Sequence, residues 1–563
     1  MKRYYFIILL CGIGALFFLL SILSAPERKG DPMFDSPDET ANYFWAQRVA
    51  KGEPLWYSEP LEVVGNSLLK PRSMNVIGTR VVPGSFLGLP LLYGYMAQWF
   101  GIWLIPYLTP LFASLAVIAF GLLMRRLFGA SMGLLSAALL AFLPPWWYYA
   151  SRGMYHNVLF VSLVIIGMSL LMCACFWIPS ISVRDDNKAR VFIRQAIRLI
   201  AYGIAGLCIG FSLVVRSSEL VWVAFLTVFC FISGWRRVRV SGALLFIACG
   251  LFAFLPLFTT NIELYDAPIS IGYRGVQGME LGEFITKLPD AQFRNLFFAP
   301  FGINFSQTVL AMQQFLVIYY WWWCALGAAG ILLMVIRFFS TSRDEKMKWA
   351  GYSASAAAVT ILLVIYYGSW AFSDRIDRNT ISLNTSFFRY WLPIYMLGIP
   401  FVAYAILALS RLLRRSRMRN AAACMAVCML AFFSARLALL DTDESLMSVR
   451  MRLSAAHFEL QAAKSHMQPQ AVIIIFPQAD KILFPAYRRL ITAMVTPDDF
   501  RAARRLAELL PVYYYTYAPP EYIGQIITPL FKKYNLQIVN GKKVYANHWV
   551  WQILPLTEAL VRF

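Results

Sequence analysis

The stretch that decides the fold is Lys2–Ser24, KRYYFIILLCGIGALFFLLSILS. From Tyr4 onward it is predominantly apolar and has the roughly 20 residues that a helix needs to cross a bilayer. Lys2 and Arg3 precede it, and basic residues favour the cytoplasmic side of a span. No clear small-residue cleavage site precedes Pro26, so we expect an uncleaved first span rather than a signal peptide. Either interpretation places the next residues outside.

Apolar runs of this kind recur along the whole chain. Of its 563 residues 59% are hydrophobic and 14% are charged, and the mean hydropathy is +0.58. These values indicate a polytopic membrane protein rather than a soluble one. The net charge of +21 is gathered in short clusters between apolar runs, which is typical of cytoplasmic loops and of contact with anionic lipids, so no nucleic-acid partner is expected. The clusters lie at Arg125, Arg184, Arg236, Arg337 and Arg411.

Placing every basic cluster inside predicts about eleven transmembrane helices. A span at Phe86–Phe100 would put the next basic cluster outside, so this segment is expected as an external helix along the membrane. Two long external loops are expected, 25–82 and 260–314, within a transmembrane domain of residues 1–440. The expected spans are Tyr4–Ser24, Trp103–Met124, Met132–Tyr149, Asn157–Ile178, Leu199–Val215, Leu220–Trp235, Ala243–Phe258, Phe315–Ile336, Ala350–Trp370, Tyr390–Ser410 and Met418–Leu440.

Residues 441–563 have the composition of a small α/β domain, expected outside the membrane. Asn540-Gly541 predicts the turn of a β-hairpin. No catalytic motif and no metal-ligand spacing of histidines is found there, and the nine cysteines of the chain lie in apolar runs, so no disulfide framework is expected. Apolar and amphipathic runs predict strands at 471–476 and 511–517 and helices at 498–510 and 519–535.

The first external loop contains DSPDETANYFWAQRVAKG, Asp35–Gly52. Ser36 suits the N-cap of a helix and Pro37 its first position, and the stretch ends on a glycine that can stop the helix. Asp38 and Glu39 then lie at the positive end of the helix dipole. The two carboxylates are therefore either a plain helix start or part of an active site.

No Asp or Glu lies in the middle of an expected span, which disfavours a proton-coupled pump. Charged and polar side chains gather instead at the external ends of spans and in the first loop, where each alone suits an interfacial anchor. Together they suit sugar transfer from a polyprenyl phosphate, which needs a carboxylate for the acceptor's proton and cations for the departing phosphate. The candidate site residues are Asp38, Glu39, Lys70, Arg72, Arg152, Tyr155, His156, Asn157, Arg216, Arg389 and Tyr390. Arg80 in the first loop and Glu219 in the turn after Arg216 are further charged residues expected at this level.

SPDETANYFWAQRVAKG (36–52) resembles the first-loop motif of the C-type (GT-C) membrane glycosyltransferases. The nearest resemblance is to the lipid A aminoarabinose transferases and protein O-mannosyltransferases of glycosyltransferase family 39. LLKP (68–71), RRLFG (125–129), YYASR (148–152) and RYWLP (389–393) occur in a similar order and placement over residues 1–440. The resemblance implies that Asp38 is the catalytic carboxylate, that Glu39 supports it, and that Lys70, Arg216 and Arg389 contact the lipid phosphate.

Two features depart from these families. Where many relatives have a second acidic residue at the start of the fourth span, this chain has Tyr155-His156-Asn157, which leaves the binding of a divalent metal open. The C-terminal domain also differs from the β-rich insertion of the mannosyltransferases. GYRGVQG (272–278), in the second loop, is either a cover for the donor or a set of plain turns.

The sequence thus predicts a glycosyltransferase of the plasma or inner membrane. It would move a sugar from a polyprenyl-phosphate donor to an external acceptor with inversion, and no cofactor is assigned. Arg72 and Arg152 are further candidates for the phosphate, and the polar residues expected to contact substrate are Tyr155, His156, Asn157 and Tyr390. The alternative is a carrier or flippase of a lipid-linked sugar without catalysis.

Overall fold

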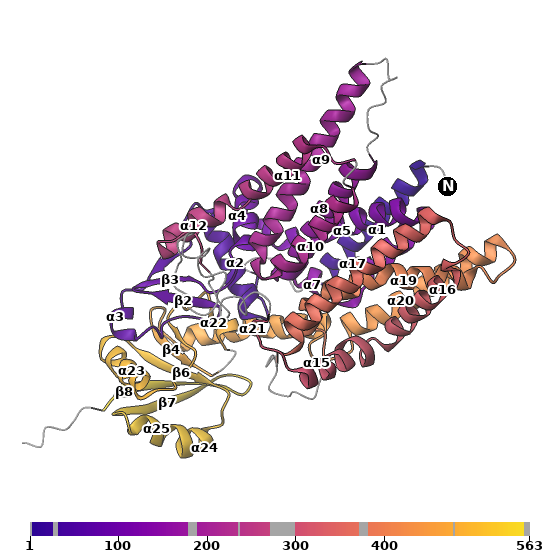
Figure 1. The fold of residues 1–563 in the computed structure, drawn as a ribbon. Helices are drawn as coiled ribbons and strands as arrows, with labels where there is room; N and C mark the ends of the chain where they lie inside the picture. Colours follow the sequence, from indigo (N-terminus) through magenta and orange to yellow (C-terminus); the bar gives the residue numbers. More distant parts are fainter. Residues whose placement is uncertain are drawn as a thin grey trace, which may run out of the picture. The chain divides into compact units, whose positions relative to one another are not determined.

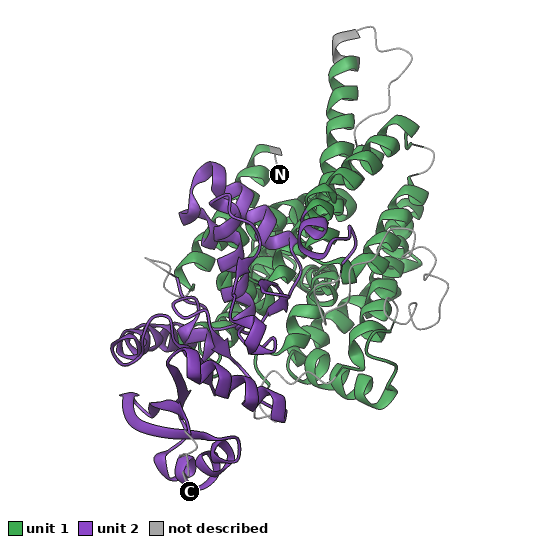
Figure 2. Cartoon of the chain, turned by 90° about the vertical axis from the view of Figure 1, so that its left-hand side faces the viewer, with its two compact units in different colours: residues 1–25, 107–259, 279–448 green, residues 26–106, 260–278, 449–563 purple. Residues whose placement is uncertain are grey.

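The computed structural model describes residues 3–25, 32–177, 188–234, 237–270, 299–370, 381–476 and 479–556, so GYRGVQG lies outside the described residues. The chain divides into two compact units, drawn in green and purple in Figure 2. Unit 1 combines residues 1–25, 107–259 and 279–448, and unit 2 combines residues 26–106, 260–278 and 449–563. The predicted boundary at residue 440 stays a prediction.

Unit 1 is helical (Figure 1), because long apolar runs can satisfy their backbone hydrogen bonds away from water only as helices. Short 3-10 and π segments interrupt or extend several of its helices. Its main helices are α1 (Arg3–Leu23), α5 (Ile105–Phe128), α6 (Ala130–Ala141), α7 (Pro144–Arg152), α8 (His156–Met172), α9 (Lys188–Val215), α10 (Leu220–Ser233), α11 (Val240–Phe252), α12 (Leu255–Tyr265, which crosses into unit 2), α15 (Phe305–Ala311), α16 (Trp321–Phe338), α17 (Arg343–Gly368), α18 (Ser386–Tyr390), α19 (Leu392–Ser410) and α20 (Ser416–Leu439).

Among the described residues, nine helices are long and apolar enough to cross a membrane, or ten if a bent pair is one span. The pair is α6 and α7, bent by 54° where Pro144 begins α7, since proline breaks the helical hydrogen-bond pattern. Helix α10, at the predicted sixth span, has only 14 residues. It is therefore not among the candidate spans of the described residues, which are nine or ten where about eleven were predicted. The polytopic α-helical membrane fold is confirmed.

Helices α9 and α11 pack at very short range because glycines line their contact. A Cβ atom on Gly206 would lie 2.2 Å from the carbonyl oxygen of Phe246, and one on Gly210 would lie 2.3 Å from that of Gly250. Small residues four positions apart allow membrane helices to approach this closely. These glycines fix the packing of the two helices within unit 1.

Unit 2 begins with α2 (Pro37–Ala50), whose N-cap is Ser36, as the sequence predicts. The Ser36 side chain makes no capping hydrogen bond, and Thr40 Oγ1 donates to the Ser36 carbonyl at 3.0 Å. Helix α4 (Gly88–Phe100) lies where a helix was predicted at 86–100, and its external placement stays a prediction. It packs on α2, where a Cβ on Gly94 would lie 2.4 Å from that of Val49.

Between these helices the first loop folds into α3 (Glu62–Gly65) and a three-stranded sheet. Its strand order is β1-β3-β2, and both pairings are antiparallel. The strands are β1 (Tyr57–Ser58), β2 (Met74–Ile77) and β3 (Arg80–Pro83).

The C-terminal part of unit 2 forms a five-stranded mixed sheet in the order β5-β4-β6-β8-β7. Strand β4 pairs in parallel with β5 and β6, while β8 pairs antiparallel with β6 and β7. The predicted small C-terminal α/β domain is confirmed. Its elements are α21 (Leu446–His466, which begins in unit 1), β4 (Val472–Ile475), α22 (Asp480–Leu483), β5 (Leu490–Ile491), α23 (Pro497–Leu509), β6 (Val512–Thr516), α24 (Pro520–Tyr522), α25 (Thr528–Lys532), β7 (Leu536–Tyr545) and β8 (His548–Pro555).

The predicted hairpin exists, but its predicted turn is wrong. Strand β7 runs through Asn540-Gly541, where the register shifts and Asn540 has φ 54°. Asn-Gly therefore forms an irregularity inside the strand, since a residue at positive φ also suits a bulge. The turn lies at Ala546-Asn547, between Tyr545 and its partner His548.

Candidate functional site

Asp38 is the second residue of α2, where the helix dipole favours a negative charge. The Ser73 hydroxyl donates a hydrogen bond to Asp38 Oδ1. Glu39, the next residue, is fully buried, so it can influence a substrate only through its neighbours. The first turn of α2 therefore both begins a helix and holds the Asp38 carboxylate through a hydrogen bond.

Ser73 itself is held in an unusual backbone conformation, with φ 63°. For a residue with a side chain this left-handed conformation costs about 1 kcal/mol. Its carbonyl accepts the Gly84 N–H at 3.0 Å, and a Cβ on Gly84 would lie 2.9 Å from the Ser73 carbonyl carbon. Only glycine lets the two backbones approach this closely, and that contact fixes the residue that holds Asp38.

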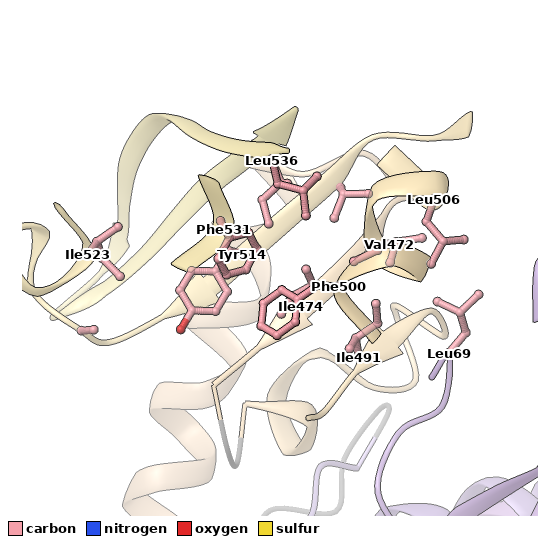
Figure 3. Close-up of a cluster of buried hydrophobic side chains, with 14 residues drawn as sticks. Leu69, Val472, Ile474, Ile491, Phe500, Leu506, Tyr514, Ile523, Phe531 and Leu536 are labelled. Carbon is pink, nitrogen blue, oxygen red and sulfur yellow. The ribbon is translucent and has the colours of Figure 1, made fainter. Parts of the chain in front are cut away.

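Lys70 follows Leu69, whose side chain is fully buried in the core of the C-terminal sheet. Figure 3 shows Leu69 on the purple segment of the first loop, near Ile491 and Leu506. The Leu69 N–H donates to Glu62 Oε1 at 2.7 Å. Burial raises the pKa of Glu62, although the N–H groups of Leu69 and Ser67 act in the opposite direction.

The same loop is tied to the sheet at two more points. Lys70 forms a parallel bridge with Ile491 of the edge strand β5, so its backbone extends the sheet by one residue. Arg72 donates from Nε and Nη2 to both carboxylate oxygens of Asp480, at 2.9 and 2.6 Å. The Asp480 side chain is only 2% exposed, so the carboxylate of this bidentate pair is shielded from solvent.

In unit 1, several predicted residues lie together around two tyrosine rings. The guanidinium carbon of Arg389 is 5.0 Å from the ring centre of Tyr155 and 5.2 Å from that of Tyr390. Arg152 donates to the Tyr155 hydroxyl at 3.4 Å and to the Tyr148 hydroxyl at 2.8 Å. Cations over aromatic faces gain more when they are desolvated, and Arg152 is buried.

Arg216 joins the same cluster through the Tyr390 ring. Its guanidinium carbon is 4.6 Å from the Tyr390 ring centre, and Nη2 lies 3.0 Å from Glu219 Oε1. Tyr367 stacks on Tyr390 at 4.8 Å, and its hydroxyl accepts a hydrogen bond from Arg216. Because both charged side chains are buried, Glu219 is the structural counter-charge of Arg216.

The start of α8 completes this group. Asn157 Nδ2 donates to the Arg389 carbonyl at 3.0 Å and so connects α8 to α18, while His156 is buried beside it in the sequence. Unit 1 thus joins six predicted residues through direct contacts: Arg152, Tyr155, Asn157, Arg216, Arg389 and Tyr390. The other predicted residues, Asp38, Glu39, Lys70 and Arg72, belong to unit 2.

Several residues of these two groups were missed by the sequence analysis. Ser73 and Asp480 carry no motif, and Asp480 lies 408 positions from the arginine it binds. Tyr367 lies at a span end and has no motif, and the short spacing from Arg216 to Glu219 in the turn after the fifth span did not by itself predict a buried pair. Among the described residues, no group of three or more His, Cys, Asp or Glu side chains is arranged to hold a metal ion.

The fold is that of a polytopic helical membrane protein with a small C-terminal mixed sheet. The chain is similar to the crystal structure of an oligosaccharyltransferase from Archaeoglobus fulgidus in complex with zinc and sulfate. The TM-score is 0.51 at 13% identity, over 90% of this chain and 67% of that chain. This similarity supports the fold alone.

A second solved structure is ArnT from Cupriavidus metallidurans bound to undecaprenyl phosphate. The similarity covers 98% of this chain and 98% of that chain at 12% identity, with a TM-score of 0.48. No protein-family model matches the sequence, and no curated protein matches it.

Proposed function

We propose that this chain is a membrane glycosyltransferase that moves a sugar from a polyprenyl-phosphate donor to an acceptor on the extracytoplasmic side, with inversion. The observation that carries the proposal is the segment Lys70–Ser73. It presents a lysine and, three residues later, the hydroxyl that holds Asp38 in place. The segment therefore carries a cation and holds the base on α2, and a base and a cation are what transfer from a sugar phosphate requires.

The proposed reaction is a single displacement. An Asp38 oxygen takes the proton of the acceptor hydroxyl while the hydroxyl oxygen attacks the anomeric carbon. The bond from the anomeric carbon to the phosphate oxygen breaks, and the electron pair leaves with the polyprenyl phosphate. Lys70 is assigned to stabilising the departing phosphate.

The test uses the full-length protein in lipid nanodiscs with polyprenyl-phosphate sugars and membrane extracts of its own source. Asp38→Asn removes the base but keeps the size of the side chain. Loss of general-base catalysis predicts a rate at least about 100-fold lower, with donor binding retained. Asp498→Asn is the matched control, because that carboxylate is 70% exposed on α23 and pairs with a neighbour on its own helix.

The flippase alternative gives a different result in the same experiment. Without catalysis, the lipid-linked sugar would cross the membrane of proteoliposomes equally well with the wild-type chain and with the Asp38→Asn variant, and no transfer product would form. Comparing cells that carry the two chains also identifies the sugar, because the lipid-linked donor accumulates and the finished glycan disappears when Asp38 is replaced.

A further inference from the structure

We propose that the C-terminal sheet positions Asp38, and that Arg72, Asp480 and Ser73 are positioning residues for this carboxylate. The inference rests on the proposed function and assigns a role to the domain that follows the membrane spans. It also gives Arg72 a task different from phosphate contact.

The first step of the argument is the anchoring of the loop. Leu69 is buried among side chains of β4, β5 and α23, and Lys70 extends the edge of β5 through its bridge with Ile491. These contacts hold one end of the loop against the sheet. A buried leucine that loses its side chain costs about 2–5 kcal/mol, so the anchor is a strong one.

The second step is the Arg72–Asp480 pair. Nε and Nη2 of Arg72 both donate hydrogen bonds to the Asp480 carboxylate. Asp480 lies in the first turn of α22, and its side chain is only 2% exposed. A buried carboxylate of this kind requires its partner, since the charge would otherwise remain uncompensated. The pair therefore fixes the backbone immediately before Ser73.

The third step leads from the loop to the carboxylate. Ser73 has a positive φ and donates to Asp38 Oδ1, while its carbonyl is held by Gly84. Strained backbone persists only where the surroundings determine it, here through the pair before it and the strand after it. A shift of the sheet edge is thus transmitted to Asp38 through the short segment Lys70–Ser73.

The deciding experiment replaces Asp480 by Asn in the full-length protein and measures sugar transfer. This change leaves Arg72 charged and reduces its bidentate contact. If Asp480 positions the base, kcat falls about 10-fold or more, since small misplacements of reacting groups cost up to about 100-fold. Arg72→Lys gives a similar loss, because lysine keeps the charge but lacks the planar fork.

Asp498→Asn and Arg501→Ala are the controls, from an ion pair on the same domain whose side chains are 70% and 66% exposed. They leave kcat unchanged. Full activity of Asp480→Asn, combined with full activity of Arg72→Lys and loss in Arg72→Ala, overturns the inference and shows that Arg72 acts through its charge.

Hydrogen exchange separates failure of this inference from failure of the proposed function. If the wild-type protein transfers no sugar from any donor, the proposed function fails. The positioning claim is then judged by amide exchange of loop residues 66–73, which must rise in Asp480→Asn relative to Asp498→Asn. Equal exchange in the two variants overturns the positioning claim whatever the activity.

A different observation in unit 1 carries a second proposal: we infer that an anionic phospholipid headgroup binds where four candidate spans end. A cavity of about 500 Å³ lies there, between the ends of α5, α16, α17 and α19. Arg337 and Arg411 line it, together with the hydroxyl residues of the turn before α17. Within the described part of the chain, neither guanidinium makes a hydrogen bond or an ion pair with another side chain.

The remaining lining suits the junction of a headgroup with its lipid chains. Trp349 and Tyr404 form part of it, with ring centres 5.3 Å apart, and aromatic residues of this type favour the interface of a bilayer. Met132 and Leu407 supply apolar surface. Glu345 is the carboxylate of the lining, so two guanidiniums face one acid and the balance favours an anion.

The test is retention of added phosphatidylglycerol or phosphatidylcholine by the delipidated full-length protein, measured by native mass spectrometry. The wild type is expected to retain more phosphatidylglycerol than phosphatidylcholine. The double variant Arg337→Ala with Arg411→Ala should lose about 10-fold or more in affinity, as expected for lost charge-assisted bonds to phosphate.

The matched control removes the same charge nearby, with Arg414→Ala and Arg417→Ala, neither of which lines the cavity. Equal retention by the cavity variant and the wild type overturns the proposal, and so does an equal loss in the control variant. Preference for phosphatidylcholine in the wild type also overturns it.

Discussion

The two groups of candidate site residues are held in place by opposite means. In unit 1, Arg216 is paired with Glu219 three positions away and stacks on Tyr390, within a cluster of span ends. In unit 2, Arg72 is paired with Asp480, which lies 408 positions later on another element. The first arrangement is a product of local sequence and membrane topology, and the second is a product of the tertiary fold. Substitutions in the two groups should therefore fail in different ways.

The largest effect on stability is expected for Arg216→Ala. It leaves Glu219 buried without its partner, which costs about 3–5 kcal/mol of unfolding free energy. Replacing both residues by leucine removes the uncompensated charge and should recover most of that loss. Denaturant unfolding in detergent measures both variants, and a loss below about 1 kcal/mol for Arg216→Ala would contradict the assignment of Glu219 as its counter-charge.

In unit 2 the corresponding test is Leu69→Ala, which removes a fully buried side chain from the core of the C-terminal sheet. The expected cost is about 2–5 kcal/mol, with faster amide exchange in β5. Leu69→Met keeps the volume and should cost less than about 1.5 kcal/mol. An alanine variant as stable as the methionine one would show that the loop is not anchored through this residue.

These differences also explain what the sequence predicted. Long apolar runs and basic clusters predicted the helical membrane fold, and the placement of Arg152, Arg216 and Arg389 at span ends predicted a group that unit 1 does bring into contact. The anchors of the first loop were beyond such reasoning, because Leu69 and Asp480 have no local pattern that announces a partner. The turn predicted at Asn540-Gly541 was wrong for a related reason. This dipeptide favours a backbone with positive φ, and such a backbone occurs in a bulge as well as in a turn.

A smaller effect is expected for Gly84→Ala, where the new Cβ would lie 2.9 Å from the Ser73 carbonyl carbon. The backbones must separate, at a cost of about 1–3 kcal/mol, and the Ser73 hydroxyl moves relative to Asp38. Gly12→Ala is the control, because its Cβ would meet nothing within 4 Å. Equal transfer rates and unfolding midpoints for the two variants would contradict the role of this close contact.

The smallest effect concerns Glu62, whose pKa is raised above the ordinary value of 4.5, mainly by burial. The folded protein therefore holds this proton more tightly than the unfolded chain does. The stability from this preference is fully present below pH 4.5 and is lost as the pH rises through the folded pKa. The unfolding temperature of Glu62→Gln should lack this part of the pH dependence. If the unfolding temperatures of the variant and the wild type change with pH in the same way, this contribution of Glu62 is contradicted.

The central claim is that Asp38, held by Ser73, is the base of a sugar transfer. The most direct measurement is the single-turnover rate of the nanodisc-embedded protein with its polyprenyl-phosphate sugar, for the wild type, Asp38→Asn and Asp498→Asn. The account predicts that Asp38→Asn is at least about 100-fold slower while it still binds the donor, and that Asp498→Asn matches the wild type. Transfer by Asp38→Asn at a rate close to that of the wild type would contradict it.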